Sequence, residues 1–238
     1  MFGEALIHLN NASKGLTNLG SKLQIQRSTG VGVASAKSCP PLFAWLSSFH
    51  DILLAKYTLY CFSAVSSAAP SPARLEELLA TERPNLVARM IQLQQRVKAQ
   101  FASLFFDGTG LRHRFCAHSY AVQETDTAEA AKGMSSIPVI FTAPLNHRPP
   151  VADTSVIVMR ISRDLSPVVE KEESCRTIYL YDEKLDRTYL IHRLEERIFL
   201  ACVFQGCRSR RDNELVDSIA SLTDVIQLRA VKCSLRTR

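Results

Sequence analysis

The sequence predicts an α+β fold in which an antiparallel β meander of about five strands is flanked by helices and preceded by a helical segment. Two observations support this prediction. Residues 42–65 have the pattern of a long helix that is apolar on two faces. Four consecutive runs after residue 154 are rich in β-branched and aromatic residues, as strands are.

Two segments precede the long helix. Residues 4–27 contain leucines at helical spacing, and residues 28–39 are rich in glycine and small residues. We therefore expect a helix followed by a linker within residues 1–39. Two prolines then open the long helix, because proline is tolerated in the first helical turn.

An amphipathic helix is expected next, with Asn85 as its amino-terminal cap. From Leu86 onward its apolar residues recur every three or four positions, and polar residues lie between them. The apolar run at 103–107 predicts a short buried strand. Residues 111–153 predict a long loop with one strand, because they contain several prolines and one compact apolar run.

The carboxyl-terminal part is predicted to contain the meander and a closing helix. Hairpin-length turns connect the strands, and Ser209 or Asp212 caps the helix. The helices are expected to cover one face of the sheet. The chain is thus divided into residues 1–39, an α+β domain at 40–228 and a disordered basic tail at 229–238. The four strands after residue 154 are predicted at 155–161, 177–183, 187–194 and 197–204.

The composition is that of an ordinary globular protein, with 46% apolar and 22% charged residues. The net charge of +6 is concentrated at the two ends with few aromatic residues nearby, so we expect no nucleic-acid partner. Seven cysteines, an odd number, indicate a reduced, cytoplasmic protein. No run has the length and apolarity of a transmembrane helix, so we expect any membrane attachment to go through a partner.

One group of residues has the spacing of metal ligands. His113, Cys116 and His118 offer two imidazoles and one thiolate, which are three of the four ligands of a tetrahedral zinc ion. No second cluster is present to complete the site, so a polar loop is the better interpretation. The chain also lacks a P-loop and a nucleophile elbow. We therefore predict neither enzymatic activity nor a bound cofactor.

Three arginines precede the closing helix. Arg208, Arg210 and Arg211 place positive charge near the amino-terminal end of a helix, where the helix dipole favours anions. A contact with another protein would relieve this mild electrostatic misfit. We therefore predict that these three residues bind a partner.

Several short motifs occur in order from about residue 5 to about residue 228, and they consist of packing and turn residues. The motifs are Pro40–Phe43, Leu53–Tyr57, Ser103–Asp107, His118–Tyr120, Tyr179–Lys184 and Thr188–Leu190. In this order and spacing the sequence resembles one metazoan family, the small subunit of the KICSTOR complex, which was first catalogued as a domain of unknown function. None of the motifs is catalytic.

This resemblance implies both an organisation and a function. Members of the family carry a large helical half ahead of the region that Leu6 to Arg27 resembles, so residues 1–39 would be the remainder of a truncated helical region. Their complex sits on the lysosomal surface, recruits the GATOR complex and restrains the TOR kinase when amino acids or glucose are short. The resemblance implies a non-catalytic scaffold subunit that joins the larger KICSTOR subunits and reaches the lysosome through them.

Two alternatives stay open at this point. A GTPase-binding module of the longin or roadblock type also combines an antiparallel sheet with helices, and the predicted closing order of three strands and a helix suits it. The other alternative is a small metal-binding protein that uses His113, Cys116 and His118. Binding of a Rag-type GTPase by the isolated chain would favour the first, and stoichiometric zinc in the purified protein would favour the second.

The leucine stripe in residues 4–27 leads to a testable prediction. The resemblance implies that the helical half that packs against this stripe in the family is missing, and an exposed apolar surface of that size promotes association. We expect the 238-residue chain to self-associate at micromolar concentration, which size-exclusion chromatography measures. A sharp monomer peak would contradict this expectation.

Overall fold

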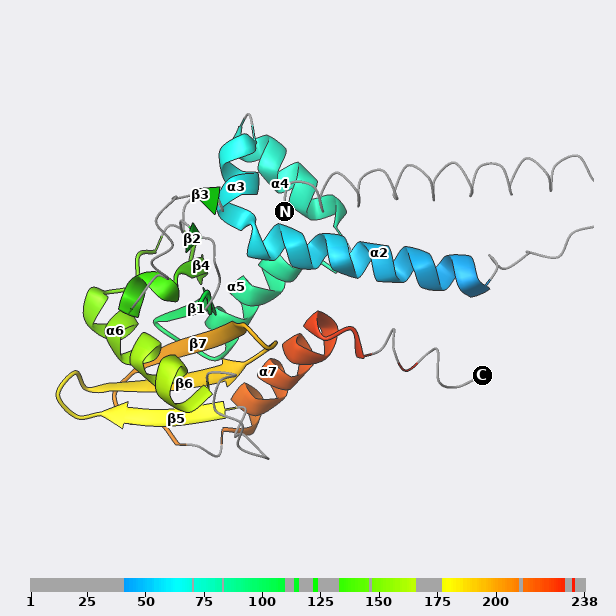
Figure 1. Cartoon of the computed structure of the whole chain (residues 1–238). Coiled ribbons are helices and arrows are strands. Elements are labelled where there is room, and N and C mark those ends of the chain that lie inside the picture. The colour runs from blue at the N-terminus through cyan, green and yellow to red at the C-terminus, as the bar shows by residue number, and fades with distance from the viewer. Residues whose placement is uncertain are drawn as a thin grey trace, which may run out of the picture.

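A five-stranded antiparallel sheet forms the centre of the fold, and helices pack on both of its faces (Figure 1). The strands are β1 (Phe101–Phe106), β4 (Val139–Ala143), β5 (Thr177–Asp182), β6 (Arg187–Arg193) and β7 (Ile198–Gln205). A separate short pair consists of β2 (Arg114–Phe115) and β3 (Val122–Gln123). The structure is a computed structural model, which describes residues 41–69, 71–82, 84–109, 114–115, 122–123, 133–145, 147–165, 177–209, 212–229 and 233.

The sheet combines a meander with a pairing of distant segments, in the order β4-β1-β7-β6-β5. β5, β6 and β7 follow one another in the chain and pair as antiparallel neighbours. β7 then pairs with β1, so that Phe101 lies opposite Val203, and β1 pairs on its other side with β4. The prediction of a five-stranded antiparallel sheet with flanking helices is confirmed, although only three of the strands form a meander.

Side-chain alternation explains why β7 is apolar at nearly every position. Successive side chains of a strand point to opposite faces of the sheet, so a strand that is covered on both faces needs apolar residues throughout. Leu200, Cys202 and Phe204 belong to the core cluster that includes residues of helices α2 (Pro41–Tyr60), α5 (Leu86–Arg96) and α7 (Asn213–Ile226). The alternate residues belong to the cluster that includes residues of helix α6 (Val151–Arg160), and they are Phe199, Ala201 and Val203.

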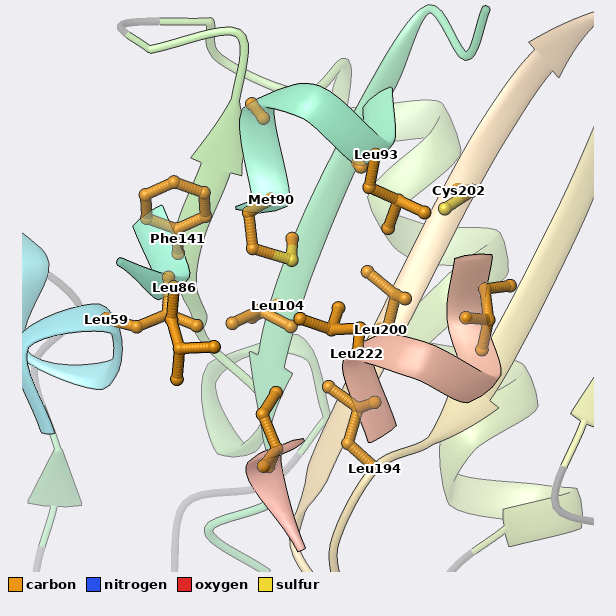
Figure 2. Close-up of a cluster of buried hydrophobic side chains, with 14 of the residues drawn as sticks. Leu59, Leu86, Met90, Leu93, Leu104, Phe141, Leu194, Leu200, Cys202 and Leu222 are labelled. Carbon is orange, nitrogen blue, oxygen red and sulfur yellow. The ribbon is translucent and has the colours of Figure 1, made fainter. Parts of the chain in front are cut away.

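The larger core lies between the sheet and the first layer of helices. Figure 2 shows Leu86 and Met90 of α5 and Leu222 of α7 close to Leu104 and Leu200 of the sheet, and all five belong to one buried cluster. Helices from both ends of the described chain therefore share this core. The helices before β1 and after β7 are α2 (Pro41–Tyr60), α3 (Phe62–Ala68), α4 (Pro72–Thr81), α5 (Leu86–Arg96) and α7 (Asn213–Ile226).

The opposite face of the sheet is covered by α6 (Val151–Arg160) and the π-helical turn η2 (Ile161–Leu165), which follow the 3-10 helix η1 (Gly133–Ser136) and β4. Two predictions are therefore wrong. The run 155–161 is helical and not a strand, and helices cover both faces of the sheet. Ile157, Ile161 and Leu165 recur every four residues and pack together against the sheet. Burial of this helical stripe outweighs the preference of the β-branched residues for strands.

The predicted caps explain where two helices begin. The carboxamide of Asn85 and the carboxylate of Asp212 each accept a hydrogen bond from the backbone N–H three residues further on, at 2.8 and 3.1 Å. The helix predicted at 42–65 is divided at Cys61 into α2 and α3. α4 is a helix that the sequence pattern did not predict, and Ser71 caps it.

Other predictions concern segments that the structure describes only in part. The division into three parts stays a prediction, because residues 1–40 and most of residues 229–238 lie outside the described residues. In the loop predicted at 111–153, β4 is the expected strand, and β2, β3, η1 and the start of α6 are additional. No helix within the described ranges is both long enough and apolar enough to cross a bilayer.

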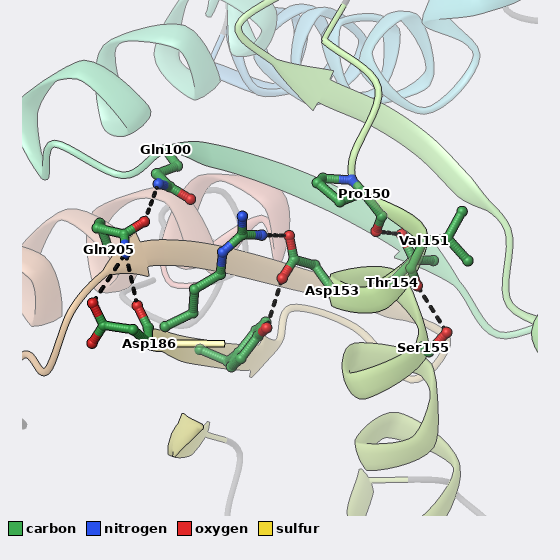
Figure 3. A network of polar contacts seen from close by, with 10 residues as sticks. Gln100, Pro150, Val151, Asp153, Thr154, Ser155, Asp186 and Gln205 are labelled. Atoms are coloured by element: carbon green, nitrogen blue, oxygen red, sulfur yellow. Dashed lines mark hydrogen bonds and ion pairs between the residues drawn. The ribbon is translucent and has the colours of Figure 1, made fainter. Parts of the chain in front are cut away.

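A buried acid connects α6 to the sheet (Figure 3). The Asp153 side chain is fully buried, and its Oδ1 accepts a hydrogen bond from the Tyr189 hydroxyl at 2.6 Å, while its Oδ2 pairs with the Arg187 guanidinium. Burial raises the pKa of the Tyr189 phenol, which keeps the hydroxyl a donor. A buried charge is tolerated when it is paired and hydrogen-bonded, so Asp153 helps to determine where α6 docks.

This network predicts a loss of stability on substitution. Asp153→Ala is expected to lower the free energy of unfolding by about 3 kcal/mol, because Arg187 and the Tyr189 hydroxyl lose their acceptor. Tyr189→Phe removes one hydrogen bond and is expected to cost about 1 kcal/mol. Urea unfolding measures both, with Asp217→Ala at an exposed position of α7 as the control. Equal stability of the Asp153 and Asp217 variants would contradict the role of the network.

Candidate protein-interaction surface

The amino-terminal half of α2 extends away from the sheet and past α7 (Figure 1). We call residues 42–53 of this helix the projecting end. Leu42 and Leu46 are 66% and 36% exposed, and the rings of Trp45 and Phe49 stack on each other with their centroids 5.3 Å apart. Large apolar side chains gathered on one exposed segment are typical of a surface that another protein covers.

The other half of α2 is held firmly in the body of the fold. Lys56 forms an ion pair with Glu195 in the turn between β6 and β7, and the Tyr60 hydroxyl donates to the same carboxylate at 2.9 Å. The Thr58 hydroxyl donates to Glu82 at 2.6 Å. Ala55 and Leu59, on the same stretch of helix, are fully buried in the larger core. The projecting end is therefore a rigid extension of a well-anchored helix.

The sequence predicted a helix that is apolar on two faces, as a helix packed between two layers is, and only the second half of α2 is buried in the core. An amphipathic pattern shows which faces of a helix are apolar, but it does not show whether the chain itself or another protein covers them. Polar residues at Ser47, Ser48, His50 and Asp51 interrupt the apolar stripes of the projecting end, and this interruption is the signal that separates it from the buried half.

Arg208, one of the three arginines predicted to bind a partner, makes several contacts within the chain. Its Nε donates to Asp212 at 3.0 Å, its guanidinium lies 4.4 Å from the centre of the Phe204 ring, and another N–H donates to the Val97 carbonyl. Its backbone N–H donates to the Thr188 hydroxyl at 3.0 Å. These bonds connect the start of α7 with β6, β7 and the end of α5.

The carboxylate of Asp212 both caps α7 and pairs with Arg208. The backbone N–H of Leu215 and the Arg208 guanidinium together lower the pKa of Asp212 below its ordinary value of 3.8. The positive charge of Arg208 at this helix end is thus balanced by an acid four residues away. This pairing removes the electrostatic misfit from which a partner contact at Arg208 was predicted.

The remaining predicted site residues fall outside the described part of the chain. Arg210 and Arg211 lie there, so partner binding by Arg208, Arg210 and Arg211 stays a prediction. The proposed metal ligands His113, Cys116 and His118 lie there too. Among the residues that are described, no group of three His, Cys, Asp or Glu side chains is placed to hold a metal ion.

Comparison with known proteins identifies the family. The chain matches the family described as "KICSTOR complex C12orf66 like" over residues 1–237. The chain belongs to this family. It is 28% identical to KICSTOR subunit 2 of Xenopus laevis over 231 residues and 27% identical to KICSTOR subunit 2 of Danio rerio over 226 residues.

These alignments cover 95% and 93% of this chain but only 50% and 49% of the two relatives. The chain therefore spans about half the length of the KICSTOR subunits that it matches. Among solved structures it is similar to Myxococcus xanthus MglB, with 11% identity and a TM-score of 0.38 over 60% of this chain and 92% of MglB. A second structure, of MglB in a tetrameric arrangement, gives 10% identity and a TM-score of 0.37, covering 59% of this chain and 84% of that one.

The Asp212 contacts predict a pH-dependent contribution to stability. Asp212→Ala is expected to lower the free energy of unfolding by about 1 kcal/mol at pH 7, since α7 loses its cap. Because folding lowers the pKa of Asp212, its ionised form stabilises the native state above pH 3.8, and this contribution is lost as the pH falls through the lower native pKa. Urea unfolding of the variant and the parent chain at several pH values measures the difference.

Asp212→Asn separates the two roles of the carboxylate, because asparagine also caps helices but carries no charge. We expect Asn to retain more stability than Ala at pH 7. A stability difference between the parent chain and Asp212→Ala that stays constant down to pH 2 would contradict the assigned ion pair and cap.

Proposed function

We propose that this chain is a non-catalytic scaffold subunit of a KICSTOR-like complex. In this proposal it joins the larger subunits, contributes to recruiting the GATOR complex to the lysosomal surface, and so restrains the TOR kinase during nutrient starvation. Membership of a family of KICSTOR complex subunits supports the first part, since other subunits of that complex are the expected partners. The role in GATOR recruitment rests on the family resemblance of the sequence.

The observation that carries the proposal is the projecting end of α2. Removing a leucine side chain from water contributes about 1.5–3 kcal/mol, so Leu42 and Leu46 offer substantial free energy to a partner with an apolar groove. Trp45 and Phe49 add a stacked aromatic pair beside them. Aromatic anchors of this kind commonly dominate the energy of a protein interface. We assign a larger KICSTOR subunit as the occupant of this surface.

A GTPase-binding module of roadblock or longin type is the second candidate. One observation favours it: β5, β6 and β7 are consecutive in the chain, pair with one another and lead directly into α7. This is the closing order of three strands and a helix that suits such a module. The two candidates differ in their direct partner, which is a GTPase in one case and a KICSTOR subunit in the other.

A capture experiment tests the main proposal. The chain, carrying an affinity tag, is expected to retain the larger KICSTOR subunits from a defined mixture that also contains a Rag-type GTPase. Leu42→Asp combined with Leu46→Asp is expected to reduce the captured amount at least about tenfold, because the charges cannot enter an apolar groove. Val151→Asp is the matched control, since Val151 is 72% exposed on α6, on the other side of the sheet.

Capture of the GTPase without any KICSTOR subunit would favour the second candidate. Failure of both this chain and full-length Xenopus laevis KICSTOR subunit 2 to capture the larger subunits would overturn the scaffold proposal. Capture by the full-length relative alone would assign the contact to the half of that protein that this chain does not match.

A further inference from the structure

A polar cavity of about 260 Å³ lies between α5 and α7, on the outer side of these two helices. Arg89, Gln92 and Arg96 of α5 line one wall, and Ser218 and Ser221 of α7 line the other. Every one of these side chains can donate a hydrogen bond. The cavity is therefore a concave site that is rich in donors and carries two positive charges.

The two arginines differ from most others in the structure because no acid neutralises them. Within the part of the chain that the structure describes, neither guanidinium forms an ion pair or a hydrogen bond. α7 carries the acids Glu214, Asp217 and Asp224, and none of them lines the cavity or pairs with Arg89 or Arg96. Six other arginines of the described residues each contact a carboxylate of the chain, and these are Arg74, Arg160, Arg163, Arg187, Arg208 and Arg229.

We propose that this cavity binds an acidic peptide segment of a partner protein. A guanidinium donates two parallel hydrogen bonds to a carboxylate, which is the geometry that Arg89 and Arg96 offer. The two arginines are seven residues apart on α5, or about 10.5 Å along the helix axis. A peptide in the polyproline II conformation has three residues per turn and rises about 3.1 Å per residue, so residues three apart lie on the same side of it, about 9.3 Å from each other. Acidic side chains three residues apart would thus each reach one arginine.

The surroundings favour a peptide over other anions. The spacing of about 10.5 Å along α5 suits a ligand that carries two separate acidic groups better than a single phosphate group. A membrane surface requires apolar side chains that enter the lipid beside the charges. The leucines that line this cavity, Leu93 and Leu222, are buried in the core and do not project. Gln92 and the two serines are placed instead to bond the backbone of a peptide.

The site is preorganised, because the two helices that form its walls, α5 and α7, are both anchored in the core. Leu93 of α5 and Leu222 of α7 belong to the same buried cluster, and Asn85 and Asp212 cap the two helices. A preformed site loses little conformational freedom on binding.

Fluorescence anisotropy with the 238-residue chain tests the proposal. The probe is a labelled peptide of repeated Glu-Gly-Ser units, and the control peptide has Gln in place of Glu. We expect binding of the acidic peptide that weakens as salt rises, because salt screens exposed charges. Arg89→Glu combined with Arg96→Glu is expected to weaken binding at least about tenfold through charge repulsion.

Arg163→Glu combined with Lys184→Glu is the matched variant, since it makes the same change in net charge at exposed positions away from the cavity. It is expected to bind as the parent chain does. The proposal is overturned if the acidic peptide does not bind the parent chain at low salt, or if the Gln peptide binds equally well. It is also overturned if the variant at Arg89 and Arg96 binds the acidic peptide as the parent chain does, or if both double variants lose binding equally.

Two further measurements keep the test decisive. If circular dichroism shows that the Arg89→Glu and Arg96→Glu variant is unfolded, Arg89→Gln combined with Arg96→Gln replaces it. This variant is also expected to bind the acidic peptide more weakly than the parent chain. Inorganic phosphate at the peptide concentration is expected not to displace the probe. Complete displacement by phosphate, or binding of phosphatidylserine vesicles in place of the peptide, would assign the site to a different ligand.

Discussion

The pairing of β1 with β7 is the interaction on which the rest of the structure depends. β1 follows the helices that begin the described chain, and β7 ends the meander, so this pairing joins segments about a hundred residues apart. Both strands are buried on both faces, and their side chains contribute to both hydrophobic clusters. Without this pairing, α2 and α5 would have no common core with α7, and α6 would have no sheet face to cover.

The helices α2, α5 and α7, which cover one face of the sheet, have two kinds of surface. Their inner sides are apolar and fill the core between the helices and the sheet. The outer sides of α5 and α7 form the cavity that contains Arg89 and Arg96, and the projecting end of α2 extends beyond both helices. The sheet supports each surface from below, which suits the proposed role of a scaffold subunit.

The sequence predicted those features that depend on neighbouring residues. Asn85 and Asp212 were predicted as caps because their side chains reach backbone groups three residues away. The strands β5, β6 and β7 were predicted because their β-branched runs are separated by short turns. The run 155–161 was misassigned, because a short β-branched segment fits a strand and a buried helix equally well by periodicity. Only packing against Tyr189 and Phe199 distinguishes the two.

The candidate surfaces were harder to predict, since they arise from contacts between distant elements. Arg89 and Ser218 come from different helices, and no spacing rule relates them. Trp45 and Phe49 have the pattern of core residues, yet their half of α2 lies beyond the sheet. Conversely, Arg208 and Asp212 are close together in the sequence and pair with each other. The Val97 carbonyl, which also accepts a hydrogen bond from Arg208, is distant in the sequence. Local charge patterns therefore say little about which arginines are available to a partner.

Amide hydrogen exchange, measured on the chain with and without a larger KICSTOR subunit, tests the central claim most directly. The account predicts that the subunit slows exchange in residues 42–53 of α2, while the amides of β7 exchange slowly in both states. Unchanged exchange in residues 42–53, with new protection only elsewhere in the chain, would contradict it.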